Sequence, residues 1–183
     1  MRRICFRPYA NADEMNWKLI ANWNSMVQPD DTVWHLGDFS FMNQEKTFSV
    51  LRQLNGKKHF ISGNHDKKVT DQIAKSEEGK KLFEFYGQYA EIKVDGQKIV
   101  LCHYPILSWN GAGKGSWMLH GHCHNNLNNK GNTRVDVGVD NTIDFVGYRP
   151  VSFEEVARVM NKRSYDFVDF VRNDDELAAL PRD

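Results

Sequence analysis

Polar residues that suit metal binding stand directly after predicted strands, and this placement constrains the fold more than any other feature of the sequence. The clearest case is the run His-Gly-His-Cys-His at residues 120–124, which follows a stretch, residues 115–119, that suits a strand. On an extended backbone, side chains two residues apart point to the same side. We therefore expect His122 and His124 to reach one metal centre while Cys123 points away.

Three further predicted strands lead into residues of the same kind. They end at Gly-Asp, at Gly-Asn-His-Asp and at His-Tyr-Pro, and they cover residues 32–36, 58–62 and 97–102. In α/β proteins, ligands bind outside the carboxyl ends of the strands. The placement therefore indicates one site built from several loops, independently of the motif letters.

Hydrophobic periodicity and capping signals predict an α/β chain. Asn11 with Glu14, and Ser152 with Glu155, have the spacing of capping boxes at two helix starts. An Asp-Gly pair predicts a hairpin turn between two apolar runs. The predicted helices cover residues 11–28, 44–54, 69–85 and 153–162, and the predicted strands cover residues 32–36, 58–62, 89–94, 97–102, 116–119 and 133–139. Gly79 interrupts the third helix.

Size and charge limit the class of protein. The 183 residues, of which 40% are hydrophobic, predict one domain over residues 1–172 and a polar tail over residues 173–183. The formal net charge is zero, which argues against a large nucleic-acid footprint because such a footprint needs clustered positive charge. A nucleotide or a short nucleic acid stays open as a substrate.

Cysteine usage and hydropathy predict a cytoplasmic location. The three cysteines are Cys5, Cys102 and Cys123, an odd number without C-x-x-C spacing, so a disulfide framework is not expected. No stretch reaches the roughly 20 apolar residues of a membrane span. A Cys-rich zinc site is not expected either, because Cys123 has no second cysteine pair to complete it.

Five side chains form the candidate ligand set, which combines imidazole, carboxylate and amide donors: Asp38, Asn64, His103, His122 and His124. Hard and borderline divalent ions prefer such N and O donors. Two ions about 3.5–4 Å apart can activate a water and neutralise a phosphoryl group, and Asp38 is the carboxylate placed to bridge them. We expect His65 to act as a general acid or a phosphate clamp, with Asp66 as the carboxylate that orients it.

Each motif alone also has a structural explanation. A Gly-Asp pair after a strand is often a turn, the segment at residues 64–66 could cap a helix, and His103 could be a core histidine. Their shared order and position favour the metal site. We expect His120 to support the site from deeper in its strand, and His35 and His59 to pack or face solvent.

The motifs resemble those of the calcineurin-like metallophosphoesterase superfamily. Its pattern runs Asp-x-His, Gly-Asp, Gly-Asn-His-Asp/Glu, His and Gly-His-x-His. The segments at residues 7–9 and 150–152 are similar to those of small, cap-less bacterial and phage members, so the resemblance covers almost the whole chain. It implies an α/β/β/α sandwich with the site where loops of both sheets meet.

The resemblance also implies roles for the candidate residues. Asp38 would bridge two divalent ions of Mn, Fe, Zn, Ni or Mg. One ion would be held by Asn64, His103 and His122, and the other by His124, while His65 would assist the leaving group.

The sequence departs from the family pattern in its first motif. No Asp-x-His occurs, and residues 4–8 match the segment just downstream of that motif in relatives. We therefore expect the sandwich to lack its first strand. One ion would then keep only Asp38 and His124 as ligands, so the site would hold one tight ion.

Two functions remain open from the sequence. The first is metal-dependent hydrolysis of phosphate monoesters or diesters by metal-activated water. The second is a catalytically impaired metal-binding scaffold or interaction protein. Four aromatic residues could stack on a nucleobase or belong to the core: Phe39, Phe41, Trp109 and Trp117.

Overall fold

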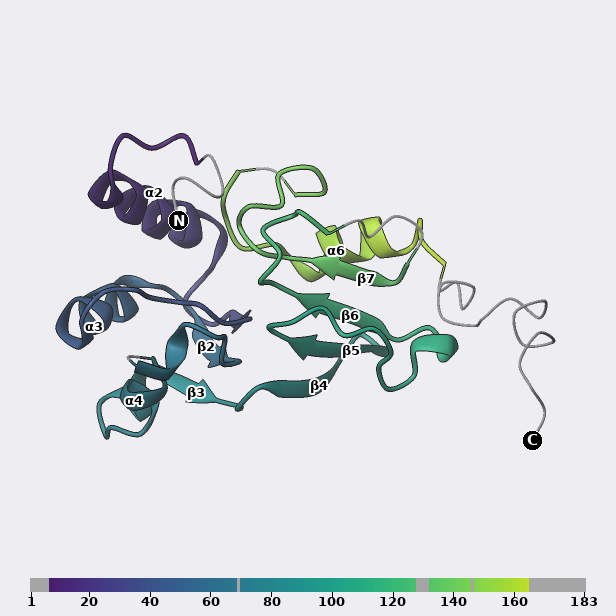
Figure 1. The fold of residues 1–183 in the computed structure, drawn as a ribbon, viewed down its shortest axis with the longest axis horizontal. Coiled ribbons are helices and arrows are strands. Elements are labelled where there is room, and N and C mark those ends of the chain that lie inside the picture. The colour runs from purple at the N-terminus through teal and green to yellow at the C-terminus, as the bar shows by residue number, and fades with distance from the viewer. Residues whose placement is uncertain (1–6, 69, 128–131, 146, 165–183) are drawn as a thin grey trace, which may run out of the picture.

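Two β-sheets organise the computed structural model, which describes residues 7–68, 70–127, 132–145 and 147–164 (Figure 1). The first sheet is parallel and has the order β1 (Thr32–His35), β2 (Lys57–Phe60) and β3 (Phe83–Phe85). The second sheet has the order β4 (Tyr89–Val94), β5 (Gln97–Cys102), β6 (Trp117–His120) and β7 (Arg134–Asp136). Only β4 and β5 are antiparallel in it. The predicted mixed α/β class is confirmed.

Strand register brings the predicted site loops together. In the first sheet His35 pairs with Phe60, so β1 and β2 end side by side. In the second sheet Leu101 pairs with Leu119, so β5 and β6 also end together. The backbone N–H of Gly121 donates to the carbonyl of His103 (3.1 Å), which continues the pairing beyond the strands.

Three of the predicted helices are confirmed, two of them from capping signals at their starts: α2 (Ala12–Met26), α3 (Gln44–Gln53) and α6 (Phe153–Met160). The side chain of Asn11 accepts from the N–H of Glu14 (2.9 Å) at the start of α2. At α6, Ser152 and Glu155 form the complete capping box. These bonds satisfy N–H groups that have no partner within the helix.

The single helix predicted over residues 69–85 is wrong. After the 3-10 turn η1 (Asp66–Lys68), the described residues form α4 (Thr70–Ala74), α5 (Gly79–Leu82) and strand β3, while Val69 lies outside the described residues. Phe83 is buried on β3, with its ring 4.5 Å from that of Phe60. Pairing with β2 and burial of Phe83 favour the strand over a longer helix. The strand predicted over residues 133–139 is also shorter than expected, because only β7, Arg134–Asp136, forms there.

Four buried clusters hold the described elements together, and the smallest, at α2 and the end of α3, consists of Trp23, Val27 and Leu54. The central cluster joins both sheets and α6: Leu36, Ile61, Ala90, Ile99, Leu101, Trp117, Leu119, Val135, Phe145, Val156 and Met160. A second cluster packs α3 and α4 on the first sheet: Phe48, Leu51, Phe60, Ile73 and Phe83. A third covers the opposite face of the second sheet: Val100, Cys102, Trp109, Ala112 and Met118. The strands that lead into the site loops are therefore held in place by buried side chains.

Within the described ranges, no helix is both long and apolar enough to cross a membrane. Cys102 and Cys123 are free thiols, and Cys5 lies outside the described residues. The predicted tail at residues 173–183 also lies outside them.

His35 gives the fold a predicted sensitivity to acid. Its ring stacks on Phe60 at 5.0 Å, and its Nδ1 is shielded from solvent without a hydrogen-bond partner among the described residues. Burial lowers the pKa of His35 to about 4. The unfolded chain takes up this proton near pH 6.5, whereas the folded chain does not, so stability falls as the pH drops from 6.5 towards 4.

We expect His35→Phe, which keeps the ring contacts, to reduce this loss by up to about 3 kcal/mol between pH 7 and pH 4. Urea unfolding of both proteins at several pH values in this window measures the difference. Any loss that His35→Phe retains comes from other groups, such as His120, whose pKa is also lowered by burial. Equal loss in the two proteins would contradict the assignment.

Candidate metal centre

A buried carboxylate, Asp66, joins the loop after β1 to the loop after β2. One of its oxygens accepts from the backbone N–H groups of Asp38 (2.6 Å) and Gly63 (2.8 Å). The other accepts from the N–H of Phe39 (3.0 Å) and the hydroxyl of Thr70 (2.8 Å). Asp66 is completely buried, so these bonds are shielded from water and hold the two loops in one arrangement.

Two glycines let these loops approach closely. Gly37 has φ +90°, and a Cβ there would lie 2.6 Å from Nδ1 of His103. A Cβ at Gly63 would lie 2.3 Å from Oδ1 of Asp38. Any side chain at either position would displace a candidate ligand, so the glycines in the two motifs are explained by contact with the site.

Four predicted ligands meet around Nε2 of His103. This atom lies 3.0 Å from Oδ1 of Asn64, 3.2 Å from Nδ1 of His122 and 3.4 Å from Oδ2 of Asp38. The donor atoms of Asp38, His103 and His122 all lie within 4.8 Å of one another. The first sheet supplies Asp38 and Asn64, and the second supplies His103 and His122.

The hydrogen bonding of His103 suits a cation at this point. Its Nδ1–H donates to the carbonyl of Leu36 (2.7 Å), which leaves the lone pair of Nε2 facing the other donors. Burial lowers the pKa of His103, but hydrogen bonds to Asp38 and Leu36 outweigh burial and leave it raised. Burial raises the pKa of Asp38, but hydrogen bonds to His103 and His65 leave it lowered. Two imidazoles, one carboxylate and one amide oxygen are a donor set that fits a divalent cation.

The loop after β6 differs from the extended backbone expected for it. Strand β6 ends at His120, and His122 and His124 have φ values of 65° and 48°. Asp38 also has positive φ, at 56°. Non-glycine residues seldom adopt this region, and they concentrate at functional sites. The alternation expected for a strand therefore does not describe how the two histidines are arranged.

His124 lies beside the four-donor group and has a different partner. Its Nδ1 is 2.7 Å from Oδ2 of Asp140, which also pairs with Arg7. Its charge contributes to the lowered pKa of His122, after burial and His103. Sequence reasoning missed Arg7 and Asp140, although Asp140 follows a predicted strand as the other candidates do.

The two predicted catalytic residues are arranged differently from each other. His65 is exposed, its backbone N–H donates to Oδ1 of Asp38 (2.8 Å), and its ring lies 4.9 Å from that of Phe41. Asp66 makes no hydrogen bond to His65 among those in the described part of the chain. Its oxygens are taken by the two loops, so its geometry suits holding the loops and differs from the orienting contact that was expected.

The remaining histidines and aromatic residues divide between core and surface. His120 is completely buried, with Nδ1–H donating to the carbonyl of Gly121 (2.8 Å), and His59 stacks on Trp34. Trp109 and Trp117 are buried in the core, and Phe39 is partly buried against core residues. Phe41 is 59% exposed and is the one of the four predicted aromatic candidates that stands open to solvent beside the site.

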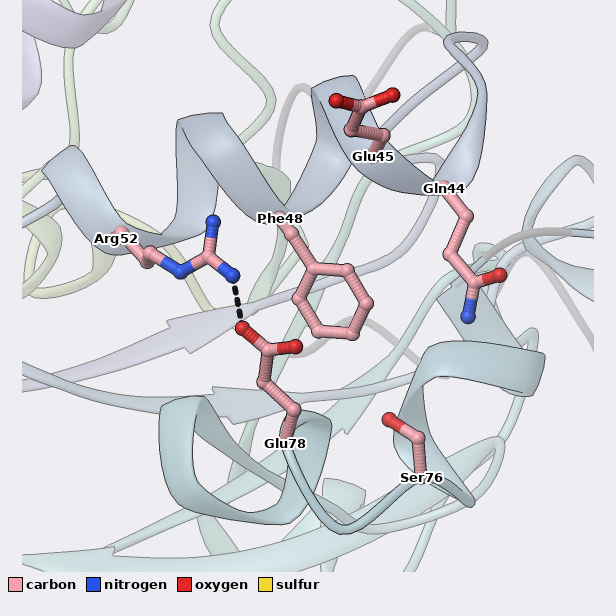
Figure 2. A pocket seen from close by; sticks show the side chains of 6 residues that line it. All are labelled: Gln44, Glu45, Phe48, Arg52, Ser76 and Glu78. Carbon is pink, nitrogen blue, oxygen red and sulfur yellow. Dashed lines mark hydrogen bonds and ion pairs between the residues drawn. The ribbon is translucent and has the colours of Figure 1, made fainter.

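A separate surface pocket lies between α3 and the α4–α5 segment (Figure 2). Its lining side chains are Gln44, Glu45, Phe48, Arg52, Ser76 and Glu78. Arg52 reaches across the pocket to pair with Glu78. The lining includes none of the candidate ligands, so this pocket is distinct from the metal centre.

Comparison with known proteins agrees with this geometry. Residues 15–138 match the calcineurin-like phosphoesterase superfamily domain, and the chain belongs to that superfamily. It is 32% identical over 169 residues to the uncharacterized protein MJ1445 of Methanocaldococcus jannaschii, covering 87% of this chain and 83% of the relative.

Phage proteins and one crystal structure are also similar. The Gene 66 protein of Mycobacterium phage L5 is 27% identical, covering 62% of this chain and 66% of its own. The Gene 66 protein of Mycobacterium phage D29 is 26% identical, with 76% and 79% covered. The crystal structure of AQ665 from Aquifex aeolicus, a protein of unknown function, matches with a TM-score of 0.60 and 23% identity over 86% of this chain and 91% of that one. This last match concerns the fold alone.

Substitution of Asp66 tests whether it holds the loops or orients His65. We expect Asp66→Ala to lower the free energy of unfolding by about 3 kcal/mol or more, because it strands buried donors that now bond a charged acceptor. Metal affinity should fall with it, since Asp38 and Asn64 sit on the released loops. Urea unfolding and metal titration measure both effects. A variant with normal stability and metal affinity but slow turnover would instead support the orienting role.

Proposed function

We propose that this protein hydrolyses phosphate esters with the help of divalent metal ions. The observation that carries the proposal is the meeting of four donors from both sheets around Nε2 of His103. Membership of the calcineurin-like phosphoesterase superfamily supports the same chemistry. The proposal includes a cytoplasmic setting, which the odd cysteine count favours.

The donors divide into a complete group and a sparse one. Asp38, Asn64, His103 and His122 would hold one ion tightly, and Asp38 would share a second ion with His124. Mn, Fe, Zn, Ni and Mg are all compatible with these donors. A divalent cation here would supply Lewis acidity toward the phosphoryl group and would make water more acidic.

The chain itself supplies orientation and proton transfer. His103 Nδ1–H donates to the carbonyl of Leu36, and backbone N–H groups of the two loops donate to the carboxylate of Asp66; these bonds hold the metal-binding side chains in place before substrate arrives. The exposed imidazole of His65, whose backbone is tied to Asp38, can reach solvent and substrate. We assign it the delivery of a proton to the leaving oxygen.

Phe41 points to the class of substrate. Its ring is 59% exposed and lies 4.9 Å from the ring of His65, the residue to which we assign proton delivery to the leaving oxygen. An exposed ring of this size gives a planar leaving group a surface to stack on. We therefore favour a phosphodiester that carries a nucleobase or another aryl group over a small alkyl phosphate.

The alternative is a metal-binding scaffold without catalysis. Both functions require the tight ion, but only the enzyme requires His65. An assay of aryl and nucleotide phosphate esters with Mn²⁺, Ni²⁺, Zn²⁺ and Mg²⁺ separates them. Tight metal binding without turnover of any ester would favour the scaffold.

His65→Ala should lower kcat by about 10²–10⁴-fold, the usual contribution of a general acid, while metal content stays unchanged. His103→Ala should remove both the tight ion and activity, because it deletes the donor around which the others meet. Metal analysis and steady-state kinetics on the two variants measure the contrast. Loss of metal in His65→Ala would show that His65 is a ligand and has no separate proton-transfer role.

Phe41→Ala should raise KM for a nucleotide or aryl diester by about 5–150-fold, since stacking on a base contributes about 1–3 kcal/mol. KM for a methyl phosphate ester should change little. Trp17→Ala removes another exposed ring, on α2, and serves as the control. Equal effects on both kinds of ester would contradict a stacking role for Phe41.

A further inference from the structure

A buried chain of charged groups leads to His124. Nδ1 of His124 lies 2.7 Å from Oδ2 of Asp140. Arg7 donates two hydrogen bonds to the same carboxylate, from Nε to Oδ1 (2.6 Å) and from a terminal nitrogen to Oδ2 (2.7 Å). The side chains of Arg7 and Asp140 are only 8% and 6% exposed. Such a bidentate pair, shielded from water, has a well-defined geometry.

The loops that carry His124 and Asp140 are themselves tied together. Strands β6 and β7 are parallel neighbours, so their carboxyl ends lie at the same edge of the sheet. Asp136, at the end of β7, is buried and accepts from the N–H of Asn125 (3.0 Å) and of Gly138 (2.8 Å). Asp136 thus fixes the backbone next to His124 and the backbone next to Asp140, and this brings the two side chains into contact.

We propose that Asp140 and Arg7 are positioning residues for His124 as a ligand of the second ion. Asp140 accepts the Nδ1–H of His124, and this leaves Nε2 as the nitrogen that can give its lone pair to a cation. A carboxylate that fixes the tautomer of a ligating histidine typically strengthens metal binding. The inference rests on the proposed function, because it assumes that His124 binds metal.

Arg7 keeps Asp140 in this role. Both oxygens of Asp140 are occupied, so the carboxylate acts through His124 and is not itself a ligand. Nε and a terminal nitrogen of Arg7 lie 2.6 and 2.7 Å from the two oxygens of Asp140, which fixes the carboxylate in the plane of the guanidinium. Arg7 also contacts the sulfur of Met15 (3.5 Å), which links the assembly to α2. The segment before α2 thus takes part in the metal site although 133 residues separate Arg7 from Asp140.

The test is a Mn²⁺ titration of the full chain, followed by electron paramagnetic resonance, with Asp140→Asn and Arg7→Gln. We expect each variant to weaken the second, weaker class of site by about 10–100-fold and to leave the tight class unchanged. His124→Ala should abolish the second class. Asp144→Asn is the matched control: Asp144 lies in the same loop region as Asp140, and its carboxylate pairs with Arg163 instead. It should leave both classes unchanged.

A spectroscopic readout separates positioning from general destabilisation. In the metal-free protein, the ¹⁵N shifts of His124 should report the Nδ1–H tautomer, and this signature should be lost in Asp140→Leu, which has no acceptor for the Nδ1–H. Arg7→Lys, which keeps the charge, should restore part of the affinity lost in Arg7→Gln. Thermal unfolding with chelator present checks that each variant is folded, and a variant that fails this check is replaced by the Arg7→Gln/Asp140→Asn pair, which removes both charges.

Unchanged weak-site affinity in folded Asp140→Asn, or an unchanged tautomer of His124 in Asp140→Leu, would overturn the proposal. So would persistence of the second class in His124→Ala. None of these results would contradict tight metal binding at His103 or the proposed hydrolysis. Conversely, a chain that binds no Mn²⁺ at all would overturn the proposed function and the inference together.

Discussion

The metal centre depends first on the buried carboxylate of Asp66. It holds the backbone of Asp38 and Phe39 after β1 against that of Gly63 after β2. A buried carboxylate that accepts several N–H groups forms strong hydrogen bonds and so holds a single loop arrangement. Without it, Asp38 in a left-handed conformation would have to be held by weaker contacts. The strain at Asp38 is therefore offset by Asp66, whose hydrogen bonds in the described part of the chain go to backbone N–H groups and to Thr70.

The site also depends on how the two sheets pack. Asp38 and Asn64 come from one sheet, and His103 and His122 come from the other. Leu36 connects them, because its side chain lies in the central cluster while its carbonyl orients His103. Any shift between the sheets would change the distances among the four donors. Metal binding to the native state should in turn stabilise this packing, since the unfolded chain cannot gather the donors.

The parts of the fold that follow from local chemistry could be predicted from the sequence. Asn11, Ser152 and the Asp-Gly turn act on neighbouring backbone, so capping and turn signals located two helices and the hairpin. The end of the 69–85 segment could not be predicted in this way, because Phe83 becomes a strand residue only by packing on Phe60. That contact belongs to tertiary structure, which overrides helix propensity.

The site shows the same division. Placement after parallel strands brought Asp38, Asn64, His103 and His122 together, because the carboxyl ends of such strands share an edge. The conformation of the His-x-His loop was not predictable, since left-handed φ values at two histidines leave no mark in the sequence. The pairing of Arg7 with Asp140 was missed for another reason: a single arginine near one end of a chain gives no indication of its distant partner.

The electrostatics of the four donors explain why they would bind a cation. Nε2 of His103 faces the oxygens of Asn64 and Asp38, which are acceptors, so a proton on Nε2 is stabilised there. This is why the pKa of His103 is raised while that of Asp38 is lowered. A divalent cation does the same with more charge and more bonds, so it competes directly with that proton. Metal binding must then release a proton as it forms, and the affinity must fall as the pH drops through the raised pKa of His103. A proton and a divalent cation therefore stabilise the same close arrangement of acceptor atoms, which Asp66 and the packing of the two sheets impose.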